Sequence, residues 1–181
     1  MRFFVVILVA ANIATTGFAD GNNMKEVLRL LYERASLGAE LKLVDGMLSN
    51  RAATFIVTDP KGKILDLSLE RSRFASLFAN ATRVKLDTEV LSFKKDSNGV
   101  TCHVEQILRV EKVDPVKARL VSLELSQKCT DRWEPGENGV LRITRSQLEL
   151  QRYSVGPPLG VDPLWPTVIN TTTSSTPKSE K

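Results

Sequence analysis

The chain has 181 residues, with 25 lysines and arginines against 21 aspartates and glutamates and a formal net charge of +4. Acidic and basic residues alternate along the chain and form no basic stripe with interleaved aromatic residues, so nucleic-acid binding is not expected. The sequence contains neither a glycine-rich phosphate loop nor a Gly-x-Ser-x-Gly motif, and we expect no cofactor.

Residues 1–19 are predicted to be a secretory signal peptide. Arg2 supplies a positive start, an apolar run follows over residues 3–11, and the small residue Ala19 precedes the expected cleavage site. The alternative is a membrane anchor, but the apolar run is shorter than the about 20 residues that a bilayer span needs. We therefore expect a secreted or periplasmic protein with no stable membrane insertion after cleavage.

Two helices are predicted at the start of the mature chain. A capping-box pattern at Asn23 and apolar residues at helical spacing predict a helix over residues 24–36. Gly38 is expected to end it, and a second, shorter helix is predicted over about 39–49.

A short hairpin and a third helix are predicted next. Apolar runs at 53–57 and 64–67 flank a spacer rich in turn residues, which predicts two paired strands. Ser68 is expected to cap a helix that runs to Ala79. The positions predicted to be buried on this helix are Leu69, Phe74, Leu77 and Phe78.

Four antiparallel strands are predicted in the second half of the chain. The first covers residues 83–94, two long strands lie between 99 and 134 with a turn at Asp114-Pro115, and the last covers about 140–151. Asn98-Gly99 has the turn chemistry expected between the first two strands.

The two long strands alternate apolar and polar residues, and this alternation predicts how they pair. A register that places Leu108 opposite Leu123 keeps the apolar residues on one face, and it also places Cys102 opposite Cys129. Directly opposed cysteines in an exported chain predict a cross-strand disulfide; the alternative is two buried free thiols that pack as small apolar residues. A metal site is not expected, because His103 follows Cys102 in a strand and points to the opposite face.

The element order predicts one α+β domain over residues 20–152, a cone-shaped curved antiparallel sheet with helices on one face in the order ααββαββββ. This order, the run Cys-Thr-Asp-Arg-Trp-Glu at 129–134 and the Leu-Arg-Ile segment at 141–143 resemble the nuclear transport factor 2-like superfamily, of the SnoaL-like kind. The resemblance covers about residues 24–152, and Leu141 departs from it where many relatives carry an aromatic residue. It implies a half-barrel with a pocket, in relatives that include isomerases, dehydratases, cyclases, transport factors and oligomerisation modules.

The inner face of the sheet supplies the candidate pocket residues. Pairing Trp133 with Val140 in the last hairpin places Arg142 opposite Asp131, whereas a register shifted by one residue brings Arg145 inward instead. We interpret Asp131 as a structural partner of an arginine, against the alternative of a general base. The expected pocket residues are Asp131, Trp133, Gln127, Gln106, Arg142 and Tyr32.

The sequence favours a non-catalytic function. We expect an exported domain that binds a small apolar ligand or forms a homodimer through its sheet, because only one carboxylate is placed in the pocket and an arginine neutralises it. The alternative is an isomerase or hydro-lyase with Asp131 as general base. An Asp131 that is unpaired, deep in the cavity and beside a second carboxylate or Tyr32, would reverse this choice.

Two segments follow the domain. A proline-rich extension at 153–169 carries apolar residues around Trp165, so we predict that Val155–Ile169 packs back onto the domain. Residues 170–181 contain no large apolar side chain and are predicted to be a disordered tail.

Overall fold

The computed structural model describes residues 21–114 and 119–156, beginning with the long helix α1 (Gly21–Glu40). Buried Met24, Leu28 and Tyr32 follow one another every four residues and form one face of the helix. The helix is longer than predicted at both ends, and only the short α2 (Val44–Met47) stands where a second helix was predicted over 39–49.

Gly38 lies inside α1 and does not end it. A Cβ atom at this position would lie 2.3 Å from the backbone carbonyl carbon of Gly46, so the missing side chain lets α1 approach α2 closely. The sequence predicts that Gly38 ends the helix, whereas in the structure this glycine allows two helices to pack closely.

Helix α3 (Leu67–Phe78) is capped by Asp66, whose Oδ1 accepts a hydrogen bond from the Leu69 backbone N–H at 2.8 Å. The prediction of Ser68 as the cap was therefore wrong. Phe74 and Phe78 are buried as predicted, but Leu69 is 53% exposed. Glu70 is only 4% exposed and takes an inward position.

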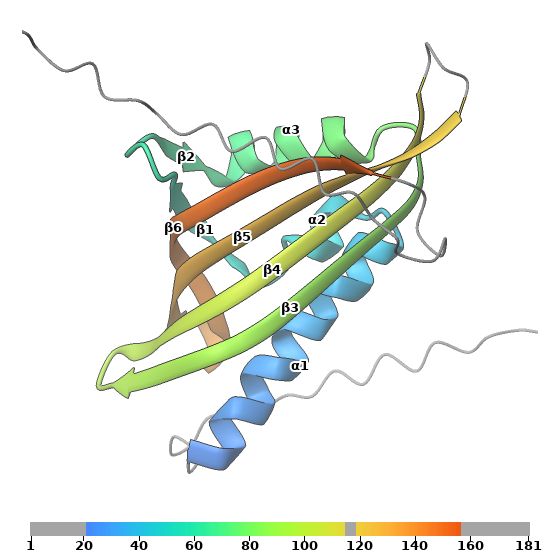
Figure 1. The fold of residues 1–181 in the computed structure, drawn as a ribbon. Coiled ribbons are helices and arrows are strands. Elements are labelled where there is room, and N and C mark those ends of the chain that lie inside the picture. Colours follow the sequence, from blue (N-terminus) through green and yellow to red (C-terminus); the bar gives the residue numbers. More distant parts are fainter. Residues whose placement is uncertain (1–20, 115–118, 157–181) are drawn as a thin grey trace, which may run out of the picture.

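Six strands form one curved sheet in the order β2-β1-β6-β5-β4-β3, and the helices gather on one side of it (Figure 1). The α+β class and the predicted order of helices and strands are confirmed. The sheet is mixed rather than fully antiparallel, because β1 and β6 run parallel. The strands are β1 (Arg51–Thr58), β2 (Ile64–Asp66), β3 (Ala81–Asp96), β4 (Gly99–Asp114), β5 (Arg119–Pro135) and β6 (Leu141–Gly156).

The register of β4 and β5 differs from the prediction by two residues. Leu108 pairs with Leu125, and Cys102 pairs with Asp131. Side chains in a strand alternate between two faces, so a shift of two residues keeps every side chain on its predicted face. The apolar pattern therefore excluded a one-residue slip but could not select among registers two residues apart.

The pairing of β5 with β6 also differs from the prediction. Trp133 pairs with Ile143 rather than Val140, because the 3-10 turn η1 (Glu137–Gly139) and a bulge between Arg132 and Trp133 take up the extra residues. Both predicted registers of this hairpin were therefore wrong. Asp131 pairs with Ser146, so Arg142 does not meet it, and Arg145 is exposed and does not point inward.

Strand β6 runs to Gly156, which pairs with Ser122 of β5, and so extends beyond residue 152. Val155 belongs to this strand and is 66% exposed. The rest of the predicted proline-rich extension, the tail at 170–181 and the signal peptide at 1–19 lie outside the described residues. None of the helices in the described ranges has an apolar stretch long enough to cross a bilayer.

The core consists of two apolar clusters that meet inside the curve of the sheet. One surrounds Trp133 and Phe55, and the other surrounds Phe74 and Phe78 of α3. Residues of both clusters line the cavity described next.

Candidate functional site

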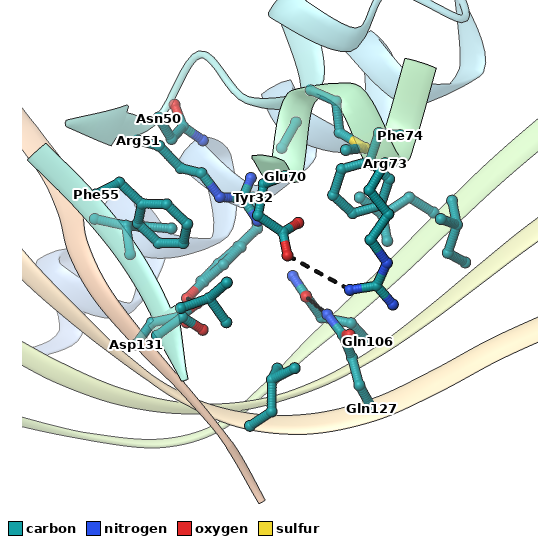
Figure 2. Close-up of a pocket in the computed structure, with 18 of the residues that line it drawn as sticks. Tyr32, Asn50, Arg51, Phe55, Glu70, Arg73, Phe74, Gln106, Gln127 and Asp131 are labelled. Atoms are coloured by element: carbon teal, nitrogen blue, oxygen red, sulfur yellow. Dashed lines mark hydrogen bonds and ion pairs between the residues drawn. The ribbon is translucent and has the colours of Figure 1, made fainter. Parts of the chain in front are cut away.

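A cavity of about 40 Å³ lies between the inner face of the sheet and the helices (Figure 2). Apolar side chains and polar groups contribute about equally to its lining, and the polar groups reach it from α1, α3 and the strands. The polar lining residues are Tyr32, Asn50, Arg51, Glu70, Arg73, Gln106, Gln127, Asp131 and Ser146.

The inner end of the cavity holds a buried carboxylate that accepts hydrogen bonds from two hydroxyl groups. The Tyr32 hydroxyl donates to Oδ2 of Asp131 and the Ser146 hydroxyl donates to Oδ1, each at 2.6 Å. Nε1 of Trp133 donates to the Tyr32 oxygen at 3.1 Å. Elements α1, β5 and β6 thus meet in one buried hydrogen-bond network.

Burial dominates the acid–base properties of this network. Loss of solvation raises the pKa of Asp131 from its usual 3.8, while the Ser146 and Tyr32 hydroxyls and the charge of Arg51 act in the opposite direction. Burial and then the negative charge of Asp131 raise the pKa of Tyr32 well above its usual 10. Tyr32 therefore remains a protonated hydrogen-bond donor at neutral pH.

The mouth of the cavity carries an ion pair on α3. Glu70 is buried and accepts a hydrogen bond from Arg73 at 3.5 Å, a long contact that Figure 2 marks with a dashed line. The Arg73 guanidinium also donates to the Tyr153 hydroxyl of β6 at 2.5 Å, which ties α3 to the sheet.

A row of amide side chains crosses the floor of the cavity. Nε2 of Gln127 donates to Oε1 of Gln106 at 2.8 Å, and Gln106 in turn donates to the Thr88 hydroxyl at 3.4 Å. Gln151 donates to Gln127 at 3.5 Å, so the row spans β3, β4, β5 and β6. Gln106 and Gln127 orient each other and present polar atoms toward the cavity (Figure 2).

Arg51 reaches the cavity from the first residue of β1. One face of its guanidinium lies over the Phe55 ring, with the Cζ atom 4.8 Å from the ring centroid. Its Nε atom is buried and has no hydrogen-bond acceptor among the described residues.

The structure places four of the six predicted pocket residues, Asp131, Tyr32, Gln106 and Gln127, at the cavity. Trp133 lies behind Tyr32 in the core. Arg142 donates to the backbone carbonyl of Ser49, and β5 pairs it with Glu134, so it does not meet Asp131. The predicted Asp131–Arg142 pair was wrong because the hairpin register differs.

Sequence reasoning missed Asn50, Arg51, Glu70, Arg73 and Ser146. Glu70 and Arg73 are charged residues of a helix that was expected to show only apolar residues to the core. One signal was available: an Asp66 cap, with the helix starting at Leu67, places residues 70, 73, 74 and 77 along one side of α3.

The two cysteines are free thiols, which corrects the predicted disulfide. With Cys102 opposite Asp131 and Cys129 opposite Val104, the cysteines are diagonal neighbours rather than directly opposed. Diagonal positions are typically about 7–8 Å apart, beyond the usual span of a disulfide. Among the described residues, no group of three or more potential metal ligands lies together.

We predict that both thiols of the folded protein are unreactive toward a disulfide reagent at pH 8. Both are buried, and burial raises the pKa of Cys102 to about 12, so little thiolate forms. Thiol titration should count no reactive cysteine in the folded protein and two after denaturation without reductant. An intact mass lower by two hydrogens would contradict the free-thiol state.

Comparison with known proteins identifies the fold. No family model and no curated protein matches the sequence. Among solved structures, a nuclear transport factor 2-like superfamily protein from Salmonella enterica superposes with a TM-score of 0.55 at 10% identity, over 81% of this chain and 100% of that one. A conserved protein from Planctomyces limnophilus gives 0.58 at 7% identity, over 70% and 94%. The protein Aln2 from a Streptomyces species gives 0.52 at 15% identity, over 74% and 94%.

These identities are low, so the likeness establishes the fold alone. The chain has the fold of the nuclear transport factor 2-like superfamily, which confirms the resemblance seen in the sequence. Because this fold carries many functions, function has to be argued from the cavity.

Proposed function

We propose that this chain is an exported, non-catalytic domain that binds a small molecule in the cavity between its helices and its sheet. The observation that carries the proposal is a cavity with apolar side chains in its lining, into which polar groups converge from several elements. The pattern of residues 1–19 supports export.

The hydrogen bonding of the two cavity carboxylates supports binding over catalysis. Both oxygens of Asp131 already accept hydrogen bonds from hydroxyl groups, and Glu70 is bonded to Arg73. A general base needs an oxygen that can take a proton from the substrate, and these partners would have to be displaced or turned first.

One observation favours a second candidate, an isomerase or hydro-lyase with Asp131 as general base. Within the described residues Asp131 has no ion pair, it is buried, and it lies next to Tyr32. Burial also raises its pKa, which strengthens it as a base. We rank this candidate second because Asp131 is not unpaired: both of its oxygens accept hydrogen bonds from hydroxyl groups.

Homodimerisation remains a prediction of the sequence analysis. The face of the sheet away from the helices carries ion pairs such as Arg109 with Glu124 at 2.8 Å, and the exposed Leu91 on the edge strand β3. Light scattering of the purified protein at several concentrations tests it, and a constant monomer mass would exclude it.

Ligand-observed NMR tests binding with a set of neutral, cationic and anionic compounds of about four to eight heavy atoms. The wild-type protein is expected to bind at least one class, and Leu108→Phe is expected to abolish this binding because Leu108 lines the cavity. Ile107→Phe is the matched control, since the neighbouring residue of β4 points to the opposite face. Failure of every compound to bind, or unchanged binding by Leu108→Phe, would contradict the proposal.

A further inference from the structure

Among the residues that the structure describes, Arg51 is the cationic side chain of the cavity that forms no ion pair. Its Nε is buried and has no hydrogen-bond acceptor there. The guanidinium lies over the Phe55 ring, with its Cζ atom 4.8 Å from the ring centroid. The Nη N–H groups are the donors that remain for a ligand.

The other ionisable side chains of the cavity are partnered. Glu70 and Arg73 form an ion pair with each other, so their charges offset. Asp131 is held by the hydroxyls of Tyr32 and Ser146. The positive charge of Arg51 acts to lower the pKa of Asp131, but no hydrogen bond or ion pair joins the two side chains among the described residues, so the guanidinium can pair with a ligand.

We infer that the ligand of the cavity is a small monocarboxylate whose carboxylate group pairs with the guanidinium of Arg51. A guanidinium presents its N–H groups in a planar fork that matches the two oxygens of a carboxylate. The carboxylate would accept from the Nη N–H groups of Arg51, and apolar lining residues such as Phe55 and Leu125 would hold its hydrocarbon part.

The cavity limits the size of this ligand. A volume of about 40 Å³ accommodates about three water molecules, at about 10–15 Å³ for each. Three waters occupy about 90 Å³ in the liquid, at about 30 Å³ each, which is comparable to acetic acid, an acid of about four heavy atoms. Acetate is therefore the suitable probe.

The inference rests on the proposed function, and charge-matched probes separate the two. Calorimetry or NMR titration should show wild-type protein binding acetate about 10-fold to 100-fold more tightly than the neutral acetamide, the range for a charge-assisted hydrogen-bonded pair. Ethylamine is the cationic control and is expected to bind more weakly than acetamide, because Arg51 repels it.

The variant Arg51→Gln is expected to lose this 10-fold to 100-fold preference and to keep its affinity for acetamide. Arg145→Gln is the matched control, because Arg145 is an exposed arginine on the adjacent strand β6 and pairs with Ile56 of β1. Arg51→Lys keeps the charge but lacks the fork, so an intermediate preference is expected.

Each outcome decides one of the two proposals. Equal binding of acetate and acetamide by the wild-type protein overturns the carboxylate inference while leaving a small-molecule site, and this comparison needs no variant. Unchanged preference in a folded Arg51→Gln protein overturns the assignment to Arg51. A third outcome is that none of the three probes binds, while other compounds of the NMR set bind to the wild-type protein and not to Leu108→Phe. The binding proposal then stands and the carboxylate inference fails. If nothing binds, both fail.

Discussion

Replacing Trp133 with alanine is expected to lower the free energy of unfolding by about 3–5 kcal/mol, the range for removing a large buried aromatic side chain. The indole is 0% exposed and meets the Tyr32 ring edge-on, with the ring centroids 5.2 Å apart. Its Nε1 also donates to the Tyr32 hydroxyl, which itself donates to Asp131. The substitution therefore removes core packing and one donor of the buried network together.

Trp133→Phe separates these two effects. Phenylalanine keeps most of the aromatic packing and removes only the N–H donor, so a smaller loss of about 1–2 kcal/mol is expected. Guanidinium denaturation followed by far-UV circular dichroism measures both variants. A loss below about 1 kcal/mol in the alanine variant would contradict the role of Trp133 as a centre of the core.

The sequence predicted the faces of the strands better than their pairing. Alternation of apolar and polar residues placed Leu108 and Asp131 on the inner face, because a side chain's face depends only on whether its position is odd or even. The partners of these residues depend on turn length and on bulges, which alternation does not encode. The errors in the Cys102–Cys129 and Asp131–Arg142 pairs have this one cause.

The missed cavity residues have a different cause. Glu70, Arg73 and Arg51 are charged, and charged side chains are rarely buried unless they find a partner. Arg73 has one partner that is distant in the sequence, Tyr153 of β6. Its other partner, Glu70, lies one turn away from it on α3, on a face that was not predicted to point inward. Only the tertiary structure brings these groups to one cavity.

The hydrogen bonds of Asp131 explain how a carboxylate can lie in the core without an arginine. Burying an ionised carboxylate is costly unless strong hydrogen bonds replace water, and the hydroxyls of Tyr32 and Ser146 supply two. They offset only part of this cost, because the net effect of the site is to raise the pKa of Asp131. The folded protein therefore holds the proton of Asp131 to a higher pH than the unfolded chain does.

This raised pKa makes the stability of the protein depend on pH in a defined direction. Because the folded state has the higher pKa, the contribution of Asp131 to the free energy of unfolding is fully present below its usual pKa of 3.8 and is lost as pH rises through the raised value. Asp131→Asn cannot ionise and should escape this loss. Its stability relative to wild type is therefore expected to increase with pH, by at most about 1.4 kcal/mol per pH unit.

Asp96→Asn provides a control of opposite sign. Hydrogen bonds from Arg132, and then from the Asn98 backbone, hold the pKa of the exposed Asp96 carboxyl well below its usual 3.8. Its contribution to stability is present above that value and is lost as pH falls, so the difference between Asp96→Asn and wild type should shrink toward acid. Urea denaturation of the three proteins at intervals between pH 3 and pH 8 measures both trends. If the wild-type and Asp131→Asn curves run parallel over this range, Asp131 does not change its charge on folding, and the hydroxyls of Tyr32 and Ser146 offset the whole cost of its burial.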